Sequence, residues 1–139
     1  MKPLHPVVHL HVFNKKGELY LQKRPEWKDI QPGKWDTAVG GHVDYGETIV
    51  QALHREVLEE IGISEYSPES MGRYVFESDR EKELVNVFRT TYDTPLHPST
   101  TELDGGRFFS HEEIAQRIGK GVFTPNFEKE WLRLFSHEG

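Results

Sequence analysis

Three glutamates, Glu56, Glu59 and Glu60, lie close together near the middle of the 139-residue chain. In a helix, residues at positions i, i+3 and i+4 project from one side, within an arc of about 100°. Carboxylates crowded on one turn repel one another by roughly 0.2–0.5 kcal/mol per pair, and a divalent cation removes that repulsion. Clustered carboxylate oxygens are the hard ligands that Mg²⁺ or Mn²⁺ binds, with phosphate oxygens and waters completing the coordination. The spacing therefore predicts a magnesium or manganese site for a phosphate-containing ligand.

A helix from about Thr48 to Ile61 must position these carboxylates. Gly62 follows directly and is typical of a helix end. The apolar residues of the segment recur every four positions and form the stripe that faces a core: Ile49, Leu53, Val57 and Ile61. A Glu-rich helix face is usually just solvated, so the spacing alone leaves that alternative open.

The residues ahead of this helix have types that suit a binding site. Gly40 and Gly41 allow the backbone to turn sharply and to approach a ligand closely. Glu47 lies just before the helix, within reach of Arg55 two turns into it. An arginine and a carboxylate at this separation can form a strong bidentate pair. We interpret Glu47 and Arg55 as scaffold for the site.

The rest of the chain predicts short strands and two further helices. β-branched, aromatic and alternating apolar residues predict strands at 7–14, 18–23, 37–39, 71–78, 84–92 and 107–109. Apolar residues at helical spacing predict helices at 111–118 and 125–135. Because helices lie between sheet segments and no linker interrupts the chain, we expect an α/β (α+β) fold. It would be a mixed β-sheet flanked by helices, in a single domain over residues 1–139.

Composition excludes several function classes. The net charge of −6 disfavours a nucleic-acid polymer as partner, because such binding needs a basic face that releases counterions. The chain has no cysteine, which excludes a disulfide framework, a thiolate zinc site and a cysteine nucleophile. No apolar run reaches the ~18–20 residues of a membrane span, and a signal-peptide pattern is absent. We therefore expect no membrane partner and a cytoplasmic location.

The segment from Gly41 to Ile63 resembles the Nudix box, G-x5-E-x7-R-E-U-x-E-E-x-G-U with U aliphatic, at every specified position. The resemblance implies the Nudix α/β/α sandwich and a Mg²⁺-dependent hydrolase that cleaves a phosphoanhydride bond with water as nucleophile. It implies a catalytic set of Arg55, Glu56, Glu59 and Glu60. It also implies metal binding by the three glutamates and by Gly41.

A second stretch, from Leu21 to His42, resembles isopentenyl diphosphate isomerase, which shares the Nudix fold. This resemblance implies that Arg24 and Lys28 contact a diphosphate and that Gly40 belongs to the substrate-binding site. It further implies metal binding at four positions: His5, His42, Glu81 and Glu83. The isomerase has its catalytic cysteine where this chain has Gly40. Isomerisation needs a thiol to move a proton to and from carbon, so we expect an isomerase-like hydrolase.

Several alternatives remain open at this stage. An isomerase-like activity and a non-catalytic nucleotide-binding module are the two other function classes. The general base is one of the box glutamates or a residue outside the box, with Glu81, Glu83 and Glu102 as candidates. Four aromatic residues are candidates for stacking on a nucleobase, with core packing as the alternative for each: Trp27, Trp35, Tyr45 and Phe76. The expected substrate is a nucleoside di- or triphosphate or a nucleoside diphosphate derivative, and the family suggests a homodimer.

Overall fold

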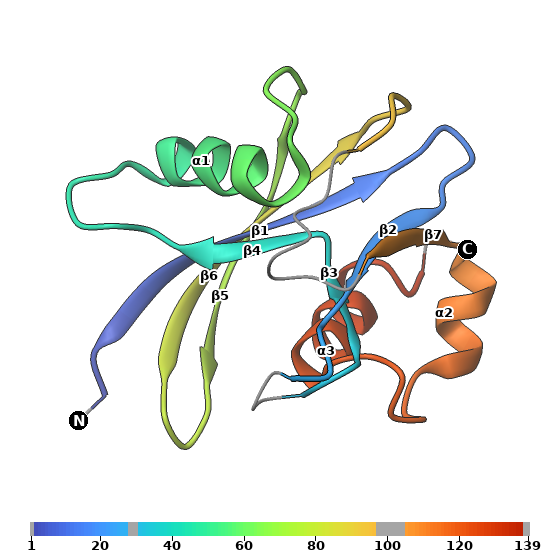
Figure 1. Ribbon diagram of the computed structural model, residues 1–139. Coiled ribbons are helices and arrows are strands. Elements are labelled where there is room, and N and C mark those ends of the chain that lie inside the picture. The colour runs from blue at the N-terminus through green and yellow to red at the C-terminus, as the bar shows by residue number, and fades with distance from the viewer. Residues whose placement is uncertain (1, 28–30, 97–104, 138–139) are drawn as a thin grey trace.

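A seven-stranded mixed sheet forms the centre of the molecule in the computed structural model, which describes residues 2–27, 31–96 and 105–137 (Figure 1). The strands are β1 (Leu4–Phe13), β2 (Leu19–Lys23), β3 (Trp35–Thr37), β4 (Val39–His42), β5 (Glu69–Glu77), β6 (Lys82–Thr91) and β7 (Gly106–Phe109). The helices are α1 (Ile49–Ile61), α2 (His111–Arg117) and α3 (Pro125–Leu134). This is the expected α+β class.

Strand β1 organises the sheet. It runs parallel to β6 over its whole length, from Leu4 opposite Lys82 to Phe13 opposite Thr91. It pairs antiparallel with β2 and β4, while β5 pairs antiparallel with β6 and forms one edge. Because β1 is paired on both sides, residues of segments far apart in the sequence meet along it.

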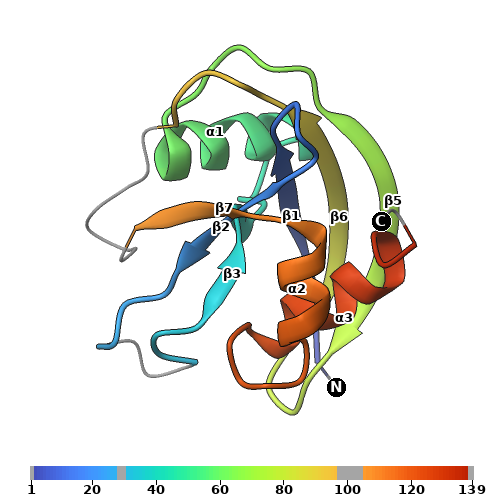
Figure 2. The same cartoon turned by 90° about the vertical axis from the view of Figure 1, so that its right-hand side faces the viewer.

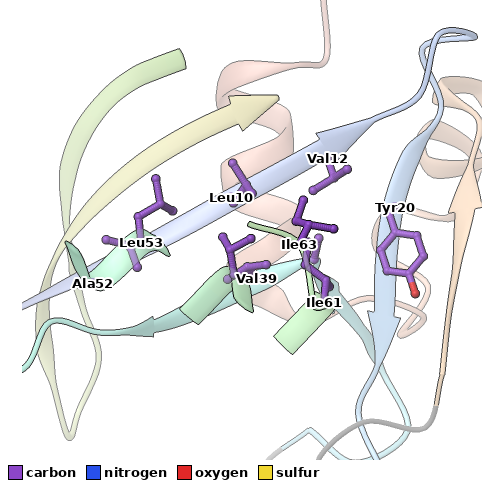
Figure 3. Close-up of a cluster of buried hydrophobic side chains, with 11 residues drawn as sticks. Leu10, Val12, Tyr20, Val39, Ala52, Leu53, Ile61 and Ile63 are labelled. Atoms are coloured by element: carbon purple, nitrogen blue, oxygen red, sulfur yellow. The ribbon is translucent and has the colours of Figure 1, made fainter. Parts of the chain in front are cut away.

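The two faces of β1 pack against different helices. Val8, Leu10 and Val12 face α1 and belong to a core cluster with its stripe residues Leu53, Val57 and Ile61, part of which is seen in Figure 3. Removal of a buried leucine such as Leu53 costs about 2–5 kcal/mol, so this cluster fixes α1 on the sheet. The opposite face carries the phenylalanine-rich cluster of α2 and α3, and Figure 2 shows these helices across the sheet from α1.

Helix α1 begins and ends where the sequence predicts. Thr48 is its N-cap and forms a capping box with Gln51, in which each side chain accepts from the other residue's backbone N–H. Gly62 has a φ of 70° and its N–H donates to the carbonyls of Val57 and Leu58. Glycine adopts the left-handed backbone conformation most readily, so Gly62 terminates the helix.

Several of the predicted strand bounds need correction. The strand predicted at 37–39 is two strands, β3 and β4, each with its own partner, β2 and β1 respectively. Strand β1 begins at Leu4, and β6 begins at Lys82, because their parallel pairing extends both beyond their apolar runs. Among the described residues, none of the helices has the length and apolar character needed to cross a membrane.

Candidate active site

Arg55 on α1 holds the loop that precedes the helix. Its Nε and Nη2 donate to the two carboxylate oxygens of Glu47 at 2.8 and 2.9 Å, and Nη2 also donates to the His42 carbonyl at 3.0 Å. The backbone N–H of Asp44 donates to the same Glu47 carboxylate at 2.8 Å. The structure thus brings Glu47 and Arg55 together and fixes the path of the chain between β4 and α1.

These hydrogen bonds also fix the charges of the pair. The hydrogen bond from Arg55 and the backbone hydrogen bond from Asp44 lower the pKa of Glu47 to about 2. The hydrogen bonds to Glu47 and Glu56 raise the pKa of Arg55. Both side chains are therefore ionised at neutral pH, and the loop is held by a charge-assisted bidentate pair.

The box carboxylates differ in their surroundings. Glu56 accepts from Arg55 Nη1 at 2.6 Å and its side chain is 14% exposed, whereas Glu59 lies 3.6 Å from Arg55 and is 59% exposed. The Oε2 atom of Glu60 is buried. In the part of the chain that the structure describes, no three side chains of metal-ligand type converge on one point.

Gly41 is the residue that gives Glu56 its place. A Cβ atom at this position would lie 2.2 Å from the Glu56 Cδ and 2.4 Å from its Oε2. No side chain fits there while the carboxylate keeps its position. Glycine at 41 therefore places a carboxylate and the backbone of β4 in direct contact, with oxygen donors on both.

A second group of predicted ligands lies where β1 and β6 begin. His42 Nε2 is 3.5 Å from Glu83 Oε2, and the rings of His5 and His42 have centroids 6.4 Å apart. The parallel register places His5 directly opposite Glu83. Glu81 lies in the adjoining turn and, with Glu83, lines a cavity of about 660 Å³. Three of the four positions implied by the isomerase resemblance, His5, His42 and Glu83, are thus neighbours in space, and Glu81 shares the cavity wall with Glu83.

This cavity also contains the predicted diphosphate contact Arg24, whose Nη1 is 3.9 Å from Asp36 Oδ2. Gly40 lies on β4 opposite His9 of β1. Lys28 and Glu102 lie outside the described residues. The wall residues are mostly charged or polar: Arg24, Gln31, Asp36, Ser78, Asp79, Arg80, Glu81, Glu83, Thr124 and Asn126.

The four aromatic candidates for nucleobase stacking differ in their burial and in whether they line the cavity. Trp35 packs edge-on against Phe109 at 5.0 Å and belongs to the core cluster of α3, so its predicted core alternative holds. Trp27 and Tyr45 are exposed, at 67% and 106%. Phe76 alone among the four lines the cavity.

A buried polar network on the α3 side of β1 was missed at the sequence level. Glu130 on α3 is fully buried and contacts His9 Nδ1 at 2.9 Å, His11 Nε2 at 2.5 Å and the Tyr74 hydroxyl at 2.5 Å. His9 and His11 share one face of β1 with the buried residues Val7 and Phe13, and this two-residue spacing is the one sign of the network in the sequence.

The network holds a stable pattern of charge. Burial alone lowers the pKa of His9, but the charge and hydrogen bond of Glu130 raise it overall. Burial alone raises the pKa of Glu130, but the charge of His9 and the hydrogen bonds from both histidines lower it overall. Burial raises the pKa of Tyr74, and Glu130 raises it further. The surroundings therefore favour the ionised carboxylate of Glu130, and its charge in turn favours the protonated form of His9.

Comparison with known proteins decides the family. The family model described as the NUDIX domain matches residues 3–127. The chain belongs to the Nudix family. An uncharacterised Nudix hydrolase of Pseudomonas aeruginosa is 36% identical over 124 residues, which cover 89% of this chain and 73% of that protein. Isopentenyl-diphosphate Delta-isomerase 1 of Photorhabdus laumondii is 29% identical, covering 96% of this chain and 81% of the isomerase.

Solved structures of other proteins have the same fold. A MutT protein from Methanosarcina mazei superposes with a TM-score of 0.79 at 30% identity, covering 96% of this chain and 94% of the other. The DR0079 protein of Deinococcus radiodurans superposes with a TM-score of 0.83 at 24% identity, covering 94% of this chain and 83% of the other. The predicted Nudix fold is confirmed.

These matches settle the class of enzyme. The chain is a Nudix pyrophosphohydrolase, an enzyme that hydrolyses a pyrophosphate-containing substrate, and enzymes of this family use divalent metal ions. The predicted likeness to the isomerase branch is confirmed by the isomerases among its relatives.

Proposed function

We propose that this Nudix enzyme uses Mg²⁺, with Mn²⁺ as a substitute, to hydrolyse a nucleoside di- or triphosphate or a nucleoside diphosphate derivative. The observation that most directly supports this proposal is the contact between the Glu56 carboxylate and Gly41, which leaves no room for a Cβ at position 41. This contact joins box helix and strand β4 at a point with carboxylate and carbonyl oxygens. Hard oxygen donors of this kind suit Mg²⁺.

The donors are oxygen atoms of the type that suits a magnesium ion. Glu56, Glu59 and Glu60, together with the Gly41 carbonyl, would hold it. When bound, Mg²⁺ would neutralise charge on the phosphates and lower the pKa of water near the phosphorus. Arg55 supports this arrangement because it positions the β4–α1 loop through Glu47 and contacts two of the three carboxylates.

The cavity next to β6 suits a polar, diphosphate-bearing substrate. Arg24 and Arg80 supply positive charge in its wall, and Phe76 supplies one aromatic face for a nucleobase. In the hydrolysis, water attacks one phosphorus and the bridging oxygen leaves with its electron pair on the other phosphate. The acceptor of the water's proton is one of the carboxylates that face the phosphates.

Gly40 argues against isomerisation as the activity. A thiol at this position would be the group that moves a proton at carbon, and the chain has glycine there and no cysteine elsewhere. The complete glutamate set instead supports hydrolysis.

A panel assay tests the proposal. The enzyme with Mg²⁺ is incubated with nucleoside di- and triphosphates, nucleoside diphosphate derivatives and isopentenyl diphosphate, and released phosphate and pyrophosphate are measured. We expect cleavage of at least one nucleotide and no conversion of isopentenyl diphosphate to dimethylallyl diphosphate. Isomerisation above background would assign the protein to the isomerase class. Inactivity on every compound, with metal bound, would favour a non-catalytic nucleotide-binding module.

A further inference from the structure

The proposed chemistry leaves the buried network around Glu130 unexplained. The Glu130 side chain has no exposed surface, and a buried carboxylate with its counter-charge costs several kcal/mol of desolvation. A pair of well-packed apolar residues would stabilise α3 on the sheet at least as well. The network therefore calls for a role beyond packing.

The two histidines of the network differ in one respect. Both contact Glu130, but His11 is fully buried and its Nδ1 has no hydrogen-bond partner. His9 keeps 12% of its side-chain surface exposed. Unlike Nδ1 of His11, its Nε2 is not a buried atom without a partner. With Nδ1 fixed on Glu130, Nε2 is the nitrogen of His9 that remains for a ligand.

Gly40 leaves this nitrogen uncovered. Its φ is not in the left-handed region, so the backbone itself does not require glycine here. A Cβ would meet only the His9 ring, at 3.4 Å from Cδ2 and 3.7 Å from Nε2. Any longer side chain at this position would extend over the ring edge. What glycine at 40 provides is access to His9.

We propose that His9, held by Glu130 and left accessible by Gly40, is a substrate-contacting residue whose Nε2–H donates to an anionic oxygen of the diphosphate. This inference rests on the proposed function, because it places the substrate in the adjoining cavity. Glu83 lines that cavity and lies opposite His5 of β1, and His9 lies four residues further along β1 on the same face of the strand.

The charge of the ring suits this role. Burial disfavours the charged form of His9, but Glu130, Asp36 and Glu83 together favour it. A protonated imidazole presents N–H donors at both nitrogens, so Nε2 becomes a charge-assisted donor toward a phosphate. Glu130 is thus a positioning residue that fixes both the orientation and the proton of His9.

The proposal is tested by substitutions at His9 and His11 that replace one ring nitrogen by an amide donor and remove the other. H9N keeps an amide donor near the Nδ1 position for Glu130 but removes the nitrogen facing the cavity. H11Q, the matched control, keeps a donor near the Nε2 position of His11 and alters only the buried side. H9Q returns a donor near the Nε2 position of His9 and tests for rescue.

Two measurements are made: steady-state kinetics on the cleaved nucleotide, and the Kd of inorganic pyrophosphate with Mg²⁺ by calorimetry. We expect H9N to raise KM and the pyrophosphate Kd about tenfold with kcat changed less than about threefold. We expect H11Q to leave both at the wild-type value and H9Q to recover part of the loss. H9N with wild-type KM and Kd would overturn the proposal, as would equal losses in H9N and H11Q.

A second pair of variants decides the question if H9N does not fold. G40V covers the ring edge without touching the network, and G40A adds only a Cβ at ordinary contact distance. We expect a pyrophosphate Kd at least fivefold weaker in G40V than in G40A, and equal values would overturn the proposal. Weakened pyrophosphate binding in H9N or G40V without hydrolysis of any nucleotide would overturn the proposed function alone. Failure of the wild type to bind pyrophosphate would overturn the inference.

Discussion

Arg55 donates hydrogen bonds to both carboxylate oxygens of Glu47, at 2.8 and 2.9 Å, across the turn that joins β4 to α1. This geometry requires the planar fork of a guanidinium, because a lysine ammonium acts as a single point charge. Arg55 also donates through Nη1 to Glu56. The position of the Glu56 carboxylate therefore depends on the hydrogen bonds between Arg55 and Glu47.

We expect R55K to lower kcat/KM by at least about tenfold while the protein still folds. The lysine keeps the charge and the helix propensity but loses the bidentate bond. Steady-state kinetics and a thermal melt measure the two effects. Wild-type kcat/KM in R55K would show that the fork geometry has no part in the reaction.

We expect E59Q and E60Q to lower turnover by about 10²-fold or more without loss of the fold. Glutamine keeps the size of each side chain but removes a metal-binding charge. E65Q is the matched control, since Glu65 is an exposed glutamate just beyond the box helix. Turnover is measured at saturating Mg²⁺, and equal rates in all three variants would remove the box from the mechanism.

We expect Mg²⁺ to raise the Tm of the wild type, because a ligand that binds only the folded state stabilises it by RT ln(1 + [L]/Kd). A hundredfold excess over Kd gives about 2.7 kcal/mol. The shift should be clearly smaller in E60Q. An unchanged Tm at millimolar Mg²⁺ would count against a metal site formed by the folded protein.

We expect G41A to weaken Mg²⁺ affinity at least tenfold and G40A to leave it within about twofold. The added Cβ at position 41 would displace the Glu56 carboxylate, whereas at position 40 it meets the His9 ring at an ordinary contact distance. Because the Glu56 side chain can move, G41A should still fold. Calorimetric titration with Mg²⁺ measures both affinities, and equal values would separate Glu56 from the metal.

We expect the stabilising effect of Glu130 to be greatest between pH 4.5 and 6.5. The pKa of His9 is raised, so its contribution is complete below 6.5 and is lost as pH rises through the folded-state pKa. The pKa of Glu130 is lowered, so its contribution is complete above 4.5 and is lost as pH falls through the folded-state pKa.

The variant E130Q tests this window. Removal of one member of a buried ion pair costs about 3–5 kcal/mol, which for a chain of this size is about 10–17 °C in Tm. Melting curves of wild type and E130Q across pH 4 to 9 should show the largest difference inside the window and a smaller one above it. A difference independent of pH would mean that the network stabilises by packing and not by charge.

The structure of the box segment follows from short-range interactions, so it could be predicted from the sequence. The four-residue recurrence of Leu53, Val57 and Ile61 and the glycine at 62 predicted α1, because helix periodicity and capping depend on residues within a few positions. The pairing of Glu47 with Arg55 was foreseeable for the same reason, since only one loop and two helical turns separate them. The motif also identified the family and its reaction, because its chemistry is contiguous in the chain.

Only the tertiary structure decided what lies on the other face of the sheet. His9 and Glu130 are separated by 121 positions, and no local pattern connects them. They meet because β1 is central and because the phenylalanine cluster holds α3 against it. The division of β3 from β4 and the meeting of His5 with Glu83 likewise depend on strand partners that are remote in the sequence. Periodicity reports which face of an element is buried, whereas packing alone selects the partner that meets it there.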